Sequence, residues 1–429
     1  MLFLIPVGVI FAIFFLYQHK NGYIFGPISF AIFIYSAMGL ASIGLYTLGE
    51  NRNSFEISLE SMLYLSACLV IGFAGPFSYS DHRNRFLVIE NVALLKWLGF
   101  FQIFTSVFAI LFFAPFAFKG LTGNISDNRL DLQYGQEVLG SYGLFNSFFS
   151  LVGNLFYISI ILCFVNLAMI GRGGSRIRAI MLMLSSGVYV LYVLAYVGRD
   201  GFVYWLMSYV FLYLLFRNFL TLSIRKQINR LAFVLASLAF VAFMLITISR
   251  FSERGSIIIS LLDYSGSQIF YFNDHYMVDG PLQMGLINFK NFLEIGAFLG
   301  FNETPYFNRF EWFSFYKARD VVPWVFSTYI GSFLFDFGKA GTLFLVATIS
   351  LFSYISLRRH EKAGYLAFSN IIIFVMCSQI LTWGVFYYRQ FSAGYSLVAM
   401  VIISMCFKVS GAHKKKFVIP RVSSLDAEG

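Results

Sequence analysis

A polar and aromatic stretch from residue 250 to residue 341 interrupts a chain made mostly of apolar runs. It opens with RFSERGS (250–256), continues through IFYFNDHYMVDG (269–280) and NETPYFNRFEWFSFYKARDVVPW (302–324), and closes with STYIGSFLFDFGKAG (327–341). Charged, polar and aromatic residues are mixed here over a length far greater than that of an ordinary connection. A membrane protein with one large polar loop usually works there, because its helices mainly supply a frame.

The composition of the remaining chain requires lipid as its solvent. Of the 429 residues, 59% are hydrophobic, 12% are charged and 54 are phenylalanine. A soluble domain has roughly 25% charged residues, and its core cannot hide this much apolar surface. The four cysteines fall inside apolar runs, without the spacing of metal ligands or of a disulfide framework.

Apolar runs long enough to cross a membrane recur along the chain, since a spanning helix needs about 20 residues. They cover about residues 2–17, 23–48, 58–78, 95–118, 143–170, 179–197, 201–216, 231–249, 341–357, 364–386 and 390–407. The predicted fold class is therefore an all-α polytopic integral membrane protein with about eleven transmembrane helices. Its large outer loop is expected to contain short amphipathic helices. The predicted parts are an eight-helix transmembrane part (1–249), a large outer loop (250–340), three C-terminal transmembrane helices (341–407) and a cytoplasmic tail (408–429).

The distribution of Lys and Arg predicts the orientation. Most of the 31 basic residues fall in alternate connectors. These are Lys20; Arg83, Arg85 and Lys96; Arg172, Arg176 and Arg178; Arg217, Arg225, Lys226 and Arg230; Arg358, Arg359 and Lys362; and Lys408, Lys414, Lys415, Lys416 and Arg421. Basic connectors stay in the cytoplasm, so the large loop is expected outside and the C-terminus inside. The tail KKKFVIPRVSSLDAEG (414–429) is expected to be disordered, with its lysines near anionic lipid.

Arginines are the candidate binding residues on the predicted outer face. They are Arg129, Arg199, Arg250, Arg254, Arg319 and Arg389. Arginine keeps its charge and binds phosphate through two parallel hydrogen bonds, so such a site suits a pyrophosphate group at the membrane surface. Structural alternatives stay open: Arg250 as a snorkelling residue at a helix end, Arg199 as a surface pair with Asp200, and Arg129 as a solvated loop charge.

Candidates for proton transfer and sugar binding lie on the same face. His275 is the single outer histidine, and histidine transfers protons near neutral pH. Asp200, Asp274, Asp279 and Asp336 compete with it as general base, and Asp336 is also a candidate substrate-binding residue. A loop histidine that is hydrogen-bonded to backbone is the alternative for His275.

Aromatic residues of the large loop offer faces for sugar rings. Tyr306 and Trp312, with Tyr316 and Trp324, are the candidates, although such residues also form the aromatic belt at a membrane interface. The chain has no P-loop, G-x-G-x-x-G, H-E-x-x-H or paired acidic metal motif. We therefore expect no cofactor and no metal, and a pyrophosphate leaving group would be stabilised by fixed cations.

Three of these stretches resemble a known family. STYIGSFLFDFGKAG (327–341), YMVDGPLQMGLINF (276–289) and GRDGF (198–202) are similar to regions of the Wzy-type oligosaccharide repeat-unit polymerases, which are related to the O-antigen ligases. The layout of many spans with one large, late outer loop also resembles that family. The resemblance implies a GT-C-like glycosyltransferase architecture.

The resemblance also implies a reaction and its partners. Such enzymes polymerise undecaprenyl-pyrophosphate-linked oligosaccharide units into O-antigen or capsular polysaccharide at the periplasmic face of the bacterial inner membrane. An acceptor hydroxyl attacks the anomeric carbon, and the lipid pyrophosphate leaves. Membrane lipid and a chain-length regulator protein are further candidate partners, and no nucleic acid is expected.

Two other functions remain as alternatives. An O-antigen ligase uses the same donor with a lipid A-core acceptor. A transporter of polysaccharide or lipid-linked sugar shares the number of spans, but transporters usually have paired broken helices and charges within spans, and the sequence shows neither.

Overall fold

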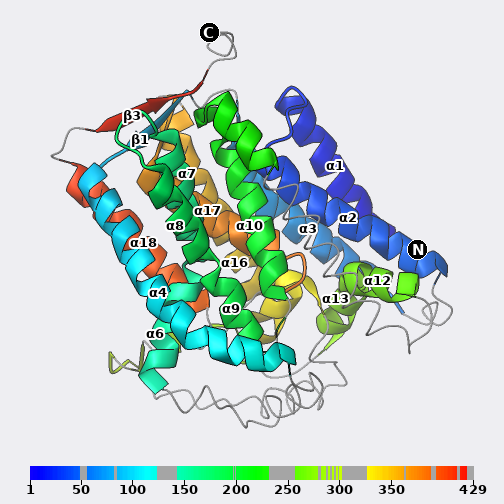
Figure 1. Cartoon of the computed structure of the whole chain (residues 1–429). Helices are drawn as coiled ribbons and strands as arrows, with labels where there is room; N and C mark the ends of the chain where they lie inside the picture. Colours follow the sequence, from blue (N-terminus) through cyan, green and yellow to red (C-terminus); the bar gives the residue numbers. More distant parts are fainter. Residues whose placement is uncertain are drawn as a thin grey trace.

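The computed structural model describes most of the chain. The described residues are 1–48, 56–81, 85–122, 143–196, 198, 200–230, 257–278, 282–286, 288–289, 292–293, 296–297, 299–301, 326–361, 364–387, 393–412 and 416–422. They form mainly a bundle of helices, with a small sheet at one end (Figure 1).

Helices make up most of the described chain. They are α1 (Leu4–Lys20), α2 (Pro27–Leu48), α3 (Leu59–Ala74), α4 (Val92–Thr122), α6 (Gly143–Asn154), α7 (Phe156–Ala168), α8 (Arg176–Ser186), α9 (Val188–Ala195), α10 (Asp200–Phe216), α12 (Ile257–Gly266), α13 (Gln268–Met277), α16 (Thr328–Glu361), α17 (Phe368–Trp383) and α18 (Ala393–Gly411). Two short 3₁₀ helices, η1 (Pro76–Ser78) and η3 (Arg217–Phe219), lie at the sheet end.

Several helices are suited to cross a membrane. Six helical stretches of the described chain are long and apolar enough, and a seventh span results if the bent pair α6 and α7 crosses as one. The helices α1, α3 and α17 are apolar but shorter. The prediction of a helical, multi-pass membrane protein is thus confirmed. The count of eleven stays a prediction, and the predicted span 231–249 lies outside the described residues.

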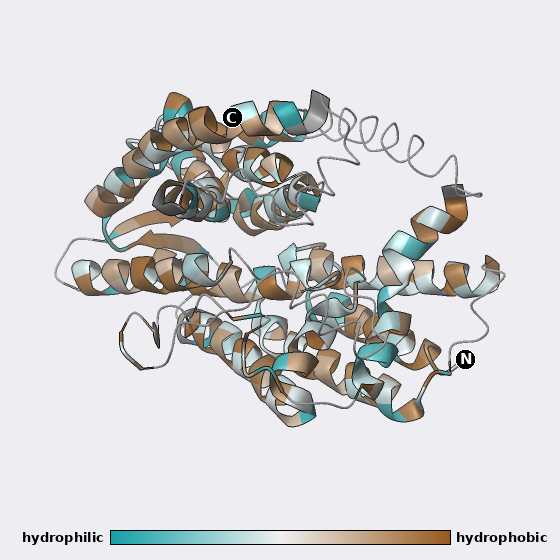
Figure 2. Ribbon diagram, turned by 90° about the horizontal axis from the view of Figure 1, so that it is seen from below, coloured by the Kyte–Doolittle hydropathy of each residue, from teal (hydrophilic) through white to brown (hydrophobic). Residues whose placement is uncertain are grey.

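Large apolar side chains cover the outside of the bundle as well as its core. Phe100 and Leu111 of α4 are 66% and 67% exposed, and Phe344 of α16 is 71% exposed. Figure 2 shows hydrophobic residues along most of the helices, with hydrophilic residues in short stretches. Water would penalise this exposure, whereas hydrocarbon is the favourable solvent for it.

The bundle includes broken helices, which differ from the sequence-based expectation. The axes of α6 and α7 meet at 44°. Inside α16, Gly338 has φ 63° and ψ −173°, a backbone conformation almost confined to glycine. The helix begins at Thr328, whereas the predicted span begins at 341. The last part of the predicted outer loop is therefore helical and leads directly into the span.

A small three-stranded sheet accompanies the helices. Its strands are β1 (Phe86–Ile89), β2 (Tyr365–Ala367) and β3 (Phe417–Pro420), in the order β2-β1-β3. The pairing of β1 with β2 is parallel, and that with β3 is antiparallel. The strands β1 and β3 lie in stretches that the charge pattern assigns to the cytoplasm, and β2 lies at the start of the predicted span 364–386, directly after a basic connector. The structure places these three segments together.

The start of the C-terminal tail is ordered, contrary to the expected disorder. Its strand β3 pairs with β1, and beyond it the Arg421 guanidinium donates to the Asp81 carbonyl oxygen at 2.7 Å. The Val422 backbone N–H donates to the Asn218 carbonyl oxygen at 2.9 Å. These hydrogen bonds satisfy backbone groups on both partners, so the tail closes the end of the bundle as far as Val422.

Candidate functional site

Four segments of the chain meet at the end of the bundle away from the sheet. The C-terminal end of α10 lies at the sheet end of the bundle, because Asn218 just after it is hydrogen-bonded to Val422 of the C-terminal tail. The N-terminal end of α17 also lies at the sheet end, because β2 directly precedes it. The other ends of these helices, at Asp200 and Trp383, therefore lie at the opposite end of the bundle. The end of α12 and the start of α16 join them there (Figure 1). All four segments belong to connectors that the charge pattern places outside.

A hydroxyl–carboxylate contact joins two of these segments. The Tyr387 hydroxyl donates to Asp200 Oδ2 at 2.8 Å. The Tyr387 ring stacks on Phe326 with centroids 5.5 Å apart and an interplanar angle of 6°. Tyr264 of α12 meets Phe326 edge-on at 5.0 Å and lies 6.4 Å from the Phe386 ring. We call Asp200, Tyr264, Phe326, Phe386 and Tyr387 the aromatic junction.

The aromatic junction is accessible and firmly held. Tyr264 is 39% exposed, and the other four side chains are half-buried. Beneath them, the Thr328 N–H donates to the Phe386 carbonyl oxygen at 2.9 Å, and the Tyr329 N–H donates to that of Gly384 at 2.8 Å. A Cβ at Gly384 would lie 2.6 Å from Cδ1 of Tyr329 in α16, so this close approach of α16 to the end of α17 requires glycine.

Stacked aromatic rings of Trp383, Phe156 and Tyr189 lie below the aromatic junction, and we call them the floor of the junction. Trp383 stacks on Phe156 at 5.6 Å, and Phe156 stacks on Tyr189 at 4.1 Å. The Trp383 indole N–H donates to Ser208 Oγ at 3.0 Å, and that hydroxyl lies 2.7 Å from Gln379 Oε1. Buried aromatic pairs with satisfied polar ends are rigid, so the floor fixes the orientation of α10 and α17.

The GRDGF stretch has a packing requirement of its own. A Cβ at Gly198 would lie 2.6 Å from Val193 Cγ1, and a Cβ at Gly201 would lie 2.5 Å from Val193 Cβ. Both glycines therefore let the turn between α9 and α10 close tightly over Val193. This tight turn sets Asp200 at the first position of α10.

His275 is buried beside the other conspicuous stretch, at residues 327–341. It is 4% exposed, and its ring meets Phe335 of α16 edge-on at 5.0 Å. Burial lowers the pKa of His275 to about 3, because it disfavours the imidazolium form. Its neighbour Asp274 is half-buried, and burial raises the pKa of that carboxyl. Of the two residues, Asp274 is the more accessible.

Polar contacts hold α13 between α3 and α16. Asn273 Oδ1 accepts from the Ser58 N–H at 2.9 Å and from Ser61 Oγ at 2.7 Å, at the start of α3. The Tyr276 hydroxyl donates to Glu60. Lys339 Nζ lies 3.3 Å from Glu60 Oε1 and 3.8 Å from the centroid of the Tyr276 ring. The short helices expected within the large loop are thus present, and α13 is docked on the bundle.

Asp336 is fully buried and holds a loop segment in place. Its carboxylate accepts hydrogen bonds from the Gly285 N–H at 3.2 Å, the Asn288 N–H at 2.7 Å and Asn288 Nδ2 at 2.6 Å. The Met284 N–H donates to the Asp336 carbonyl oxygen at 2.9 Å. Asp336 thus acts here as a positioning residue for Met284, Gly285 and Asn288, and its carboxylate is occupied by the protein's own donors.

Most of the predicted binding residues lie outside the described part of the chain. They are Arg129, Arg199, Arg250, Arg254, Arg319, Arg389, Tyr306 and Trp312, as is Asp279. Of the candidates that are described, Asp200 belongs to the aromatic junction. His275 of α13 contacts Phe335 of α16, Asp274 is its neighbour in α13, and Asp336 is a buried residue of α16 itself. Within the described ranges, no group of three His, Cys, Asp or Glu side chains is placed to hold a metal ion.

The aromatic junction contains residues that sequence reasoning missed. Phe386 and Tyr387 belong to the run VFYYRQF (385–391), which directly flanks Arg389. An aromatic run next to an outer arginine is a signal for a sugar-phosphate site, but hydropathy alone includes 386 in a span. Tyr264 and Phe326 have no comparable local signal, because their proximity depends on how α12 and α16 pack.

Comparison of the chain with family models, with curated proteins and with solved structures found no match. The functional argument therefore rests on the fold, on the geometry of the site and on the motifs of the sequence.

Proposed function

We propose that this protein is an integral-membrane glycosyltransferase that polymerises undecaprenyl-pyrophosphate-linked oligosaccharide units into O-antigen or capsular polysaccharide. It would act at the periplasmic face of the bacterial inner membrane. The observation that carries the proposal is the aromatic junction, where an accessible carboxylate lies among aromatic rings at the predicted outer end of a membrane bundle.

The position of this junction in the chain supports a pyrophosphate site beside it. Arg199 directly precedes Asp200, and Arg389 follows Tyr387 by two residues. The hydrogen bond between Tyr387 and Asp200 thus connects two segments of the chain that each contain an arginine next to the contact in sequence. Both α10 and α16 also begin here, and the N-terminal end of a helix favours an anion.

The residues suggest a division of roles. Sugar rings would stack on the Tyr264, Phe326 and Tyr387 faces, while Arg199 and Arg389 would bind the pyrophosphate of the donor. The acceptor hydroxyl would attack the anomeric carbon as the bond from that carbon to the pyrophosphate oxygen breaks. Asp200 would take the proton of the hydroxyl, with the half-buried Asp274 as the alternative base. His275 would act as a positioning residue through its contact with Phe335.

A transporter of lipid-linked sugar is the second candidate, because the structure has broken helices. The bend between α6 and α7 and the break at Gly338 are features that transporters use at their substrate sites. An O-antigen ligase would share the donor chemistry and differ in its acceptor. The three functions are distinguished by their products: a longer glycan on the lipid carrier, a glycan on lipid A-core, or an intact unit on the other side of the membrane.

Substitutions at the junction test the proposal in cells. In a strain that depends on this protein, Tyr387→Phe should shorten the surface polysaccharide ladder at normal protein level, because Asp200 loses its hydroxyl partner. Arg199→Lys should do the same, since lysine lacks the bidentate fork. Tyr213→Phe, at the other end of α10, is the matched control and should leave the ladder unchanged. Normal ladders from both test variants would remove the junction from the mechanism.

A further inference from the structure

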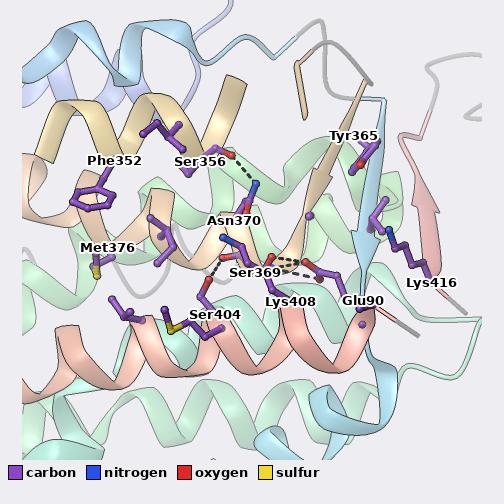
Figure 3. Close-up of a pocket in the computed structure, with 18 residues that line it drawn as sticks. Glu90, Phe352, Ser356, Tyr365, Ser369, Asn370, Met376, Ser404, Lys408 and Lys416 are labelled. Carbon is purple, nitrogen blue, oxygen red and sulfur yellow. Dashed lines mark hydrogen bonds between the residues drawn. The ribbon is translucent and has the colours of Figure 1, made fainter. Parts of the chain in front are cut away.

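A cavity of about 670 Å³ lies at the other end of the molecule, near the sheet. Figure 3 shows it between α16, α17 and α18, with the strands at one side. Helix α18 contributes one face, through Val401, Ser404, Met405 and Lys408 at helical spacing. The proposed glycosyl transfer does not use this cavity, so a separate role for it has to be considered.

The two ends of the cavity differ in polarity. Phe352 and Met376 lie at one end, away from the sheet, whereas Glu90, Tyr365 and Lys416 lie at the end beside the strands (Figure 3). Lining residues also belong to the lipid-facing surface, since Phe352 is 53% exposed and Met405 is 60% exposed. The cavity is thus an amphipathic space that opens sideways from the bundle.

The polar groups in the wall are occupied by one another. Glu90 is 7% exposed, and its carboxylate accepts from the Ser369 N–H at 3.1 Å and from the Ser369 hydroxyl. Asn370 Nδ2 donates to the Ser356 carbonyl oxygen at 3.0 Å, and Ser404 Oγ donates to that of Ser369 at 2.8 Å. These contacts leave the apolar surface of the wall as the part that is free to hold a ligand.

Two lysines supply the positive charge at the polar end. Lys408 lies in the last turn of α18, and Lys416 directly precedes β3. Both side chains are exposed, and neither forms an ion pair with a carboxylate among the described residues. Among the described residues of the lining, Glu90 is the one carboxylate, and Ser369 already engages it. The polar end therefore favours an anion.

We propose that this cavity binds one anionic phospholipid, with its phosphate at Lys408 and Lys416 and an acyl chain along the apolar wall between α16 and α18. Basic pockets between transmembrane helices on the cytoplasmic side commonly hold such headgroups. The charge pattern assigns this end to the cytoplasmic leaflet. Free phosphate would fill only the polar end and leave the apolar wall empty, so a phospholipid is the ligand that matches both ends.

The test measures lipid binding by the purified, detergent-solubilised protein. Native mass spectrometry with phosphatidylglycerol and with phosphatidylcholine of the same acyl chains should show tighter binding of the anionic lipid. The double variant Lys408→Gln, Lys416→Gln should weaken phosphatidylglycerol binding roughly tenfold or more and leave phosphatidylcholine binding unchanged. The variant Lys96→Gln, Lys226→Gln is the matched control, because it removes two exposed lysines elsewhere.

A second variant tests the apolar wall. Val401→Trp places a large ring in the cavity and should weaken the binding of both lipids, with folding checked by the melting temperature. Inorganic phosphate at millimolar concentration should not displace phosphatidylglycerol. The proposal is overturned if the double lysine variant binds phosphatidylglycerol like the control, if the two lipids bind wild type equally well, or if phosphate competes effectively.

Discussion

The hydrogen bond from Tyr387 to Asp200 connects residues that are 187 positions apart in the chain. It brings two helices together because each partner lies at or near a helix end: Asp200 is the first residue of α10, and Tyr387 lies shortly after the end of α17. A hydrogen bond to a charged group stabilises a fold by roughly 1.5–3 kcal/mol, enough to fix the approach of two helix ends. At the residue scale, this contact defines the candidate site.

His275 should make the stability of the protein depend on pH. Its pKa is about 3 in the folded protein, against 6.5 ordinarily, so the unfolded chain takes up a proton as the pH falls below about 6.5. The stabilisation from neutral His275 is complete above that pH and is lost as the pH falls from 6.5 toward 3. The loss should reach roughly 2 kcal/mol at pH 5.

Melting curves of the purified protein at pH 7 and pH 5 measure this effect. The wild type should lose more stability on acidification than His275→Gln, which has no titrating ring. His19→Gln, an exposed residue at the end of α1, is the matched control and should behave like the wild type. Equal losses in His275→Gln and wild type would show that His275 is not buried as neutral imidazole.

At the scale of single elements, α16 is the helix that links the candidate site to the span. Its break at Gly338 needs a backbone conformation that other residues adopt only with strain of about 1–3 kcal/mol. Gly338→Ala should therefore lower the melting temperature. Gly8→Ala in α1 is the matched control, because a Cβ there has no atom within 4 Å and alanine favours a helix. Similar melting temperatures for both variants would mean that α16 tolerates a side chain at its break.

The sequence predicts the long apolar helices but not the short strands, and both results have physical reasons. Long apolar runs predict helices such as α2 and α4, because lipid leaves the backbone few other ways to satisfy its hydrogen bonds. The strands β1, β2 and β3 have three or four residues each, and β1 pairs with strands that lie far from it in the sequence. No local sequence pattern therefore predicts them. The same limit applies to the aromatic junction, where Asp200 is predictable from GRDGF and Phe326 depends on tertiary packing.

At the scale of the whole molecule, the two ends of the bundle agree with the charge pattern. Connectors predicted to be cytoplasmic meet in the sheet, and connectors predicted to be outside meet at the aromatic junction. The bundle therefore separates the two sets of connectors as a membrane would. Which end faces the cytoplasm follows only from the excess of Lys and Arg at the sheet end.

Cysteine labelling of intact cells tests this orientation. Met277 at the end of α13 is 58% exposed, and Val418 in β3 is 47% exposed. In a background with Cys406→Ser, Met277→Cys should react with a membrane-impermeant maleimide that enters the periplasm, and Val418→Cys should react only after the cells are opened. The reverse pattern would place the aromatic junction in the cytoplasm and remove the periplasmic reaction.

The central claim is that this chain forms glycosidic bonds between lipid-linked units. The most direct measurement is the incubation of purified, reconstituted protein with a lipid-pyrophosphate-linked repeat unit, followed by separation of the glycans by size. The expected product is a ladder of longer lipid-linked glycans, with release of the lipid pyrophosphate. The ladder should be lost in Tyr387→Phe but not in Tyr213→Phe. Repeat units that remain single in the presence of folded wild-type protein, with the matching lipid-linked unit supplied, would contradict it.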